Sequence, residues 1–389
     1  MRLANFIVFF TVALTIYGAG NFYVFIRGYR ALPESPLIRR AYVALFIFLA
    51  LSFILAEFTE KSGITCGNRV LSLTGAYWLS FLLYCILLIA CIDIVRAADF
   101  FFNFLPPAES LRAAHIPQKL MALVAALSLC ITAAGSYIAA HPRTKTVDLY
   151  IDKPKTGDPY LDIIMVSDIH LGNIVTRKQM ERLVNSINEY SPDIVLFPGD
   201  FFDENLKPVI QDNMGGLIES IKSRYGVFAV TGNHEYIGGA EEAVAYMKKH
   251  GIRVLRDEAV TVDGLVIIGR EDRSSGRFAG RTRSDLGRIV DTVNMALPVI
   301  VMDHQPFNIQ ESADCGIDLH LSGHTHNGQM WPLNFITDRI YDVAYSYALV
   351  GKTHVYVSNG YGTWGPPVRT SGRPEMVVLR LRFAEIPHR

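Results

Sequence analysis

The sequence has few cysteines, and its charges cancel. It contains 5 cysteines in 389 residues, of which only Cys315 lies in the second half. One cysteine cannot form a disulfide within that half, and zinc-ribbon spacing is absent, so any metal there must be held by His, Asp and Asn. Lys and Arg number 37, as do Asp and Glu, giving a formal net charge of zero. Without a general surface for polyanions, we expect no nucleic-acid partner.

Charged residues are also scarce, at 19% of the chain, and long apolar segments fill its beginning. The segments are residues 3–26, 40–57, 75–95 and 119–140. About 20 apolar residues suffice to cross a bilayer core of ~30 Å. We therefore predict a transmembrane region, residues 1–140, with four helices. A cleaved signal peptide is an alternative for the first segment, but it leaves the other three unexplained.

Basic residues predict the orientation of these spans. They gather in the first and third connecting loops, as Arg27, Arg30, Arg39, Arg40, Arg96, Arg112 and Lys119. Loops rich in Lys and Arg usually stay in the cytoplasm. With four spans, both termini and the second half of the chain are then outside, although Arg143 and Lys145 weakly oppose this orientation.

The second half has the length of one sizeable domain, which we place at residues 159–389 after a linker at residues 141–158. Uninterrupted apolar runs predict buried strands at residues 163–166, 194–197, 227–230 and 299–302, with another strand at 317–321. Helices are expected at residues 180–190 and 241–250. Further strands are expected at 252–255, 259–262, 265–268, 355–358 and 376–381. The pattern predicts an α/β (α+β) fold with two packed sheets flanked by helices.

Polar motifs follow five of these strands. They are Asp168-Ile169-His170, Gly199-Asp200, Gly232-Asn233-His234-Glu235, Asp303-His304 and Gly323-His324-Thr325-His326. Open α/β sheets bind ligands in the crevice beyond the carboxyl ends of their strands. We therefore expect the motifs to converge.

The residue types in these motifs suit divalent metals. A mixed shell of Asp, Asn and His fits zinc, manganese or iron, and one carboxylate can bridge two ions. Buried carboxylates beside several imidazoles would be costly without cations to balance them. We predict a site for two divalent metal ions (Mn, Zn or Fe), which would activate water and clamp a phosphoryl group.

These motifs, in this order, resemble those of the calcineurin-like metallophosphoesterase superfamily over residues 160–385. Gly360-Tyr361-Gly362 and Pro366-Pro367-Val368-Arg369 resemble a bacterial, envelope-associated branch with N-terminal transmembrane helices. Asn327 and Glu235 depart from the commonest pattern, which puts substrate preference in doubt. The resemblance implies a two-sheet metallophosphoesterase sandwich.

The resemblance also implies a role for each motif residue. It assigns Asp168, His170 and His326 to the first metal, and Asn233, His304 and His324 to the second. Asp200 would bridge the ions, and His234 would act as the acid beside them.

The function implied is that of a membrane-anchored enzyme, hydrolysing a phosphodiester or pyrophosphate with metal-activated water. Tethering favours an envelope lipid or a cell-surface phosphate as substrate. We expect a bacterial inner-membrane protein with an extracytoplasmic catalytic domain. One alternative is a pyrophosphatase for lipid precursors such as UDP-diacylglucosamine, whose substrate is cytoplasmic. Another is a non-catalytic, metal-binding membrane scaffold.

Several residues outside the metal motifs are notable. Arg273, Arg369 and Arg373 are candidates because guanidinium groups match phosphate oxygens. Asp203 is either a partner of a metal-bound histidine or an exposed turn residue. An aromatic cluster after the last motif belongs either to the core or to a surface facing lipid headgroups; it comprises Trp331, Tyr341, Tyr345 and Tyr347.

Overall fold

The computed structural model describes residues 3–61 and 67–385, which divide into two compact units. One unit holds residues 1–137 with 365–368, and the other holds residues 138–364 with 369–389. The first is helical, and the second contains both sheets.

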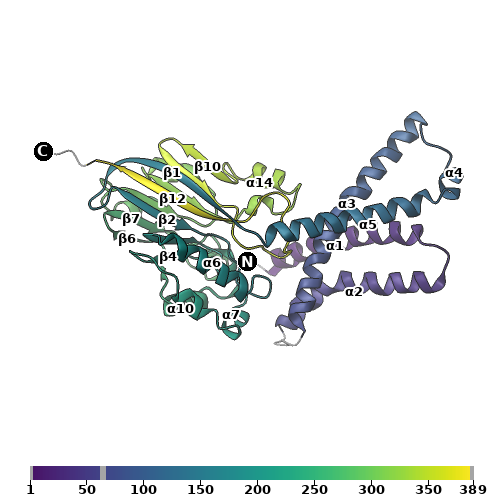
Figure 1. Ribbon diagram of the computed structural model, residues 1–389, viewed down its shortest axis with the longest axis horizontal. Helices are drawn as coiled ribbons and strands as arrows, with labels where there is room; N and C mark the ends of the chain where they lie inside the picture. The colour runs from purple at the N-terminus through teal and green to yellow at the C-terminus, as the bar shows by residue number, and fades with distance from the viewer. Residues whose placement is uncertain (1–2, 62–66, 386–389) are drawn as a thin grey trace. The chain divides into compact units, whose positions relative to one another are not determined.

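Helices account for the first unit (Figure 1). They are α1 (Leu3–Ala31), α2 (Pro36–Lys61), α3 (Asn68–Phe102), α4 (Ala108–Ala113) and α5 (Ile116–Ala139). By length and composition, three helices of the described chain could cross a membrane, at Pro36–Thr59, Asn68–Phe102 and Ile116–Ala139. The fourth expected span, residues 3–26, lies within α1 and stays a prediction.

Aromatic packing and one close backbone approach hold this unit together. The Phe46 ring meets the Phe25 ring at 5.2 Å and the Trp78 ring at 4.9 Å between centroids. A side chain at Gly75 would come within 2.5 Å of the Phe53 backbone, so a small residue lets α3 approach α2.

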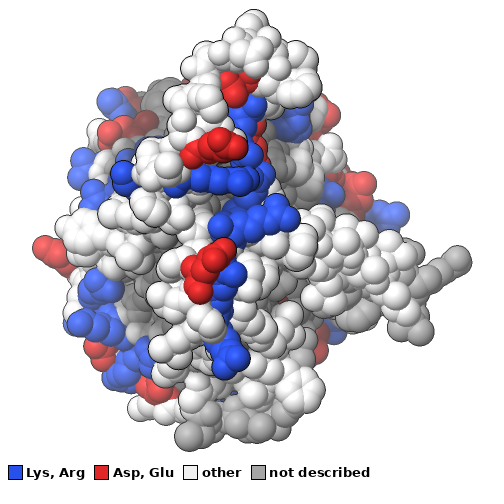
Figure 2. All heavy atoms as spheres, turned by 90° about the vertical axis from the view of Figure 1, so that its right-hand side faces the viewer, with Lys and Arg blue, Asp and Glu red and all other residues white. Residues whose placement is uncertain are grey.

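Charged residues of α1 and α3 line a common cavity of about 700 Å³. Arg27 pairs with Asp93, while Arg30 and Arg96 lie in the same lining. Figure 2 shows basic side chains gathered in a band on one face of the molecule.

The second unit contains two six-stranded sheets. The first has the order β1-β12-β2-β3-β4-β5, formed by β1 (Arg143–Pro154), β12 (Glu375–Ala384), β2 (Tyr160–Met165), β3 (Ile194–Pro198), β4 (Val227–Val230) and β5 (Arg253–Val254). The second has the order β10-β11-β9-β8-β7-β6, formed by β10 (Ser346–Val350), β11 (Thr353–Val357), β9 (Leu319–Ser322), β8 (Val299–Met302), β7 (Leu265–Gly269) and β6 (Glu258–Val262).

Helices flank and connect these strands (Figure 1). They are α6 (Arg177–Tyr190), α7 (Lys207–Gln211), α8 (Gly215–Glu219), α9 (Asn233–Gly238), α10 (Ala240–Lys249), α11 (Ser275–Phe278), α12 (Leu286–Val290), α13 (Ile309–Asp314) and α14 (Asn334–Ile340), with a 3-10 turn η1 (His326–Gly328). The predicted α/β architecture of two sheets with flanking helices is confirmed.

Alternation of side chains explains why the strands are apolar throughout. In β2, Ile163 and Met165 pack with Ile300 and Met302 of the second sheet. Ile164, between them, packs instead with residues of α6. Both faces of the strand are therefore buried, which favours an unbroken apolar run.

The expected linker is part of the first sheet. Residues 143–154 form β1, which pairs in parallel with β12 from Arg143↔Glu375 onward. Val147, Leu149 and Ile151 contact the core between the sheets. Intervening polar residues obscured this strand in the sequence, because only one of its faces is buried.

Candidate metal centre

The five motifs meet where parallel strands end. β2, β3 and β4 are parallel neighbours in one sheet, and β7, β8 and β9 are parallel neighbours in the other. Each expected metal ligand therefore lies just beyond a carboxyl end. The ligands are Asp168 and His170 after β2, Asp200 after β3, Asn233 after β4, His304 after β8, and His324 and His326 after β9.

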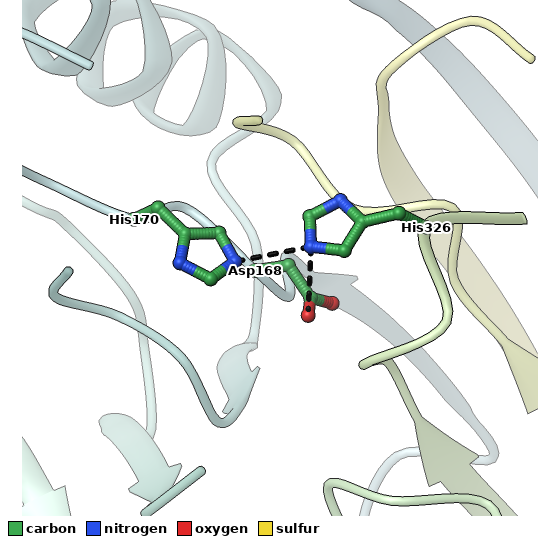
Figure 3. Close-up of side chains that lie close together, drawn as sticks. All are labelled: Asp168, His170 and His326. Carbon is green, nitrogen blue, oxygen red and sulfur yellow. Dashed lines mark hydrogen bonds and ion pairs between the residues drawn. The ribbon is translucent and has the colours of Figure 1, made fainter. Parts of the chain in front are cut away.

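Asp168, His170 and His326 form one group of metal donors (Figure 3). The Nε2 atoms of His170 and His326 are 3.0 Å apart, and His326 Nε2 lies 3.5 Å from Asp168 Oδ1. All three side chains are buried. This is the set expected for the first metal.

Asp200, His304 and His324 form a second group. His304 Nε2 lies 3.0 Å from Asp200 Oδ2 and 3.3 Å from Asn233 Oδ1. The same Asp200 oxygen is 3.8 Å from His170 Nε2, which belongs to the first group. Asp200 therefore lies between the groups, as a bridging carboxylate must.

Left-handed backbone recurs at these ligands. Positive φ angles occur at Asp168 (54°), His170 (52°), Asp200 (50°), His324 (71°) and His326 (48°). Non-glycine residues seldom adopt this region, and such strain clusters at functional sites. The surrounding fold must therefore stabilise the loops that carry the ligands.

Two motif glycines give the ligands room. A side chain at Gly232 would come within 2.1 Å of Asp200 Oδ1, and one at Gly323 within 2.1 Å of Asp168 Oδ2. Glycine is therefore required at each position so that the backbone of one motif can approach the carboxylate of another.

Glu235 supports the Asp200 loop from beneath. Its Oε2 accepts hydrogen bonds from the backbone N–H groups of Gly232 (2.7 Å) and Asp200 (3.1 Å), and its Oε1 accepts from that of Phe202 (2.9 Å). The residue is buried, and burial with the nearby Asp200 charge raises the pKa of its carboxyl to about 7. Glu235 therefore has a structural role in holding the Asp200 loop. The sequence showed only that this residue differs from the commonest form of the motif.

His234 lies between two carboxylates. Its backbone N–H donates to Asp200 Oδ1 at 2.9 Å, and its Nδ1 lies 3.1 Å from Asp203 Oδ1. Burial alone lowers the pKa of His234, but Asp200 and Asp203 outweigh it and raise the pKa to about 9. The imidazolium form, which can donate a proton, is thereby favoured at neutral pH.

The donor set fits divalent cations. Burial lowers the pKa of His170 to about 4 and that of His324 to about 3, so both rings are neutral donors at pH 7. At His304, burial opposes the charge, yet the Asp200 carboxylate raises the pKa well above its usual range. The carboxylates thus favour positive charge at this position, which a metal ion would supply.

The three expected arginine contacts have different surroundings. Arg369 is fully buried, and its Nη2 lies 2.8 Å from His326 Nδ1. Its guanidinium therefore contacts an expected metal ligand, and its contact with substrate stays a prediction. Arg373 donates from Nε to the His141 carbonyl at 2.8 Å, and Arg273 donates to the Phe307 carbonyl at 2.9 Å. Both are exposed, so their contact with substrate stays a prediction.

Comparison with known proteins agrees with this geometry. A model of the calcineurin-like phosphoesterase family matches residues 161–328, which include all seven expected metal ligands. An uncharacterized metallophosphoesterase of Helicobacter pylori is 32% identical over 248 residues, which are 62% of this chain and 64% of that relative. The chain thus spans slightly less than two thirds of that relative.

Two further relatives match this chain over a larger share of their own length. An uncharacterized metallophosphoesterase of Aquifex aeolicus is 32% identical over 57% of this chain and 85% of its own. A zebrafish (Danio rerio) protein described as a transmembrane protein with metallophosphoesterase domain is 28% identical over 92% of this chain and 84% of its own.

Removing one ligand from each group should remove one ion. We expect two divalent ions per wild-type chain, and about one in His326→Ala and in His324→Ala, because each group loses a donor. Metal content after dialysis, measured by plasma mass spectrometry, checks this. His354→Ala is the control, since His354 lies on β11 and bonds Tyr347 and Tyr150 instead. Two ions retained in both ligand variants would reject the assignment.

Asp203 should set the alkaline limit of activity. The pKa of His234 is raised, so its protonated form prevails at low pH and is lost as pH rises through that pKa. In Asp203→Asn the pKa should fall, because one of the two stabilising carboxylates is gone. The alkaline limb of the profile of kcat/KM against pH should move to lower pH. An unchanged limb would show that His234 does not govern it.

Proposed function

This chain belongs to the calcineurin-like phosphoesterase family, and we propose that it is a membrane-anchored, metal-dependent hydrolase of phosphodiester or pyrophosphate bonds. One observation carries the proposal. Asp200 lies between two groups of metal donors, 3.8 Å from His170 Nε2 and 3.0 Å from His304 Nε2. Such a pair of sites is suited to in-line attack on phosphorus, and a single structural ion would not require it.

Two divalent ions held there would lower the pKa of a water molecule and neutralise phosphoryl oxygens. The chain itself fixes the donors in place. The backbone N–H of His324 donates to the Asp168 carboxylate at 2.8 Å, and His304 Nδ1 lies 2.8 Å from the Pro198 carbonyl oxygen. These bonds orient a carboxylate and an imidazole before substrate arrives, which lowers the reorganisation needed during reaction.

His234 is the proton donor in this proposal. Asp203 holds Nδ1, so Nε2 is the nitrogen left to protonate the oxygen of the leaving group. The ring also packs edge-on against His170, with 4.6 Å between centroids. The acid therefore borders the first metal group, where a departing oxygen would be released.

The substrate we favour is an envelope lipid or a cell-surface phosphate. Three helices able to span a membrane, and a relative described as a transmembrane protein, support an integral membrane protein. Tethering confines the catalytic domain near lipid headgroups. A cytoplasmic lipid-precursor pyrophosphatase is disfavoured by the outward orientation that we propose, in the inner membrane of a bacterium. A non-catalytic scaffold is disfavoured because the expected acid and all seven ligands are present.

Loss of the acid should impair chemistry without loss of metal. In His234→Ala we expect kcat on a phosphodiester to fall about 10²- to 10⁴-fold, the usual contribution of general acid catalysis. Metal content should remain that of wild type, because His234 lies outside both expected ligand sets. Activity and metal content are measured on the same preparation, with His354→Ala as the matched control. Full activity in His234→Ala would contradict the mechanism.

Orientation can be decided independently of activity. Alkaline phosphatase fused to the C-terminus should be active, because it folds only outside the cytoplasm. A green fluorescent protein fused at the same place should be dark. The basic first and third loops motivate this expectation. A fluorescent and phosphatase-negative pair would place the catalytic domain in the cytoplasm and restore the precursor pyrophosphatase as the better function.

A further inference from the structure

We propose that an exposed apolar surface beside the metal centre contacts the lipid bilayer and admits phosphate esters carried by lipids. This surface, the apolar rim, consists of Trp331, Phe335, Ile336, Ile340 and Trp364. The proposed contact with the bilayer does not depend on the proposed function. The uptake of phosphate esters carried by lipids does rest on it.

The rim is unusual for a folded domain. Its five side chains are between 51% and 62% exposed. Three of them lie on the short helix α14, and Trp331 lies three residues before that helix. Single exposed apolar residues are ordinary, but a cluster of large ones marks a binding surface.

Local contacts join the rim to the metal ligands. Gln329, three residues after His326, donates from Nε2 to the Trp364 carbonyl at 2.9 Å and accepts the Trp364 N–H at 3.0 Å. The Trp364 ring lies 6.2 Å from the His234 ring. At the turn η1, a side chain on Gly328 would meet the Asn334 backbone within 2.3 Å, so α14 packs directly on the turn that carries His326.

The rim also lies near the place where the catalytic domain follows the last apolar helix. The backbone N–H of Trp331 donates to Thr370 Oγ1 at 2.8 Å. Arg373, three residues after Thr370, donates from Nε to the His141 carbonyl at 2.8 Å. His141 is only two residues beyond Ala139, the end of α5. Because α5 is long and apolar enough to span a membrane, the chain reaches this edge of the domain within two residues of a candidate span.

The side chains of the apolar rim favour lipid as its binding partner over a second copy of this chain or a peptide. Tryptophan prefers the membrane interface, where its ring is apolar and its N–H can meet polar headgroups. Arg339 and Asp338 are both exposed on α14, so their charges balance and the apolar side chains carry the preference for lipid. A lipid could then keep its acyl chains in the bilayer while its phosphate reaches the adjacent donors.

Quenching of tryptophan fluorescence tests the contact. The full chain with Trp78→Phe and Trp364→Phe retains Trp331 as its one tryptophan, because the sequence contains 3. In vesicles of brominated phosphatidylcholine, we expect its emission to be quenched relative to vesicles of ordinary phosphatidylcholine.

Tyr160→Trp, in a background with all three native tryptophans changed to phenylalanine, is the matched control. Tyr160 is 57% exposed and pairs with Arg382 near one end of β12. Arg143, two residues after His141, pairs with Glu375 at the other end of that strand. We expect no quenching at position 160. Equal quenching at both positions, or none at position 331, overturns the contact. Absence of quenching together with crosslinks between rims of two copies would assign the surface to self-association.

Substrate preference tests the uptake. In Phe335→Ser with Ile336→Ser, the ratio of hydrolysis of a vesicle-borne phosphodiester lipid to that of a soluble phosphodiester should fall about tenfold or more, since apolar contact is lost. An unchanged ratio overturns uptake through the rim. If the wild-type chain hydrolyses neither substrate, the proposed function fails, while the quenching result still decides whether Trp331 touches lipid.

Discussion

The arrangement of the catalytic domain depends on the interactions of the buried Asp200 carboxylate. This carboxylate lies between imidazoles of both metal groups and accepts the backbone N–H of His234. A buried carboxylate is stable only with charge partners and hydrogen bonds around it. His304 after β8 and His170 after β2 provide those partners, so the two sheets must come together at this point.

Strain around the centre is balanced by the packing beneath it. The left-handed residues that carry the ligands follow strands whose last three side chains are buried. Glu235 adds three backbone hydrogen bonds below the Asp200 loop, and Arg369 fills the space behind His326. A rigid core thereby holds loops in conformations that they would not adopt alone.

In the proposed arrangement, attachment to the membrane would determine which phosphate esters reach the metal centre. The apolar helices would confine the domain to a surface, and the exposed rim from Trp331 to Ile340 would orient it there. Only a few residues of chain separate α5 from β1. The substrate would then be selected by its place in the bilayer as well as by its phosphate.

The sequence by itself determined the strands with long apolar runs, the motif order, the donor types and the apolar helices. These properties are local, because side-chain periodicity and residue chemistry follow from neighbours along the chain. The capping box at Thr176 and the hairpin turn between β6 and β7 were predictable for the same reason. The candidate ligands could be named because each follows a strand, and parallel strands end at one edge.

Tertiary structure alone decided what depends on distant partners. The pairing of β1 with β12 was hidden, because a strand buried on one face reads like a polar linker. The burial of Arg369 behind His326 and of Glu235 beneath Asp200 was equally hidden, since a charged residue in a loop is usually exposed. Arg369 and Glu235 are buried because they bond to residues far away in the sequence. No local sequence pattern specifies such contacts.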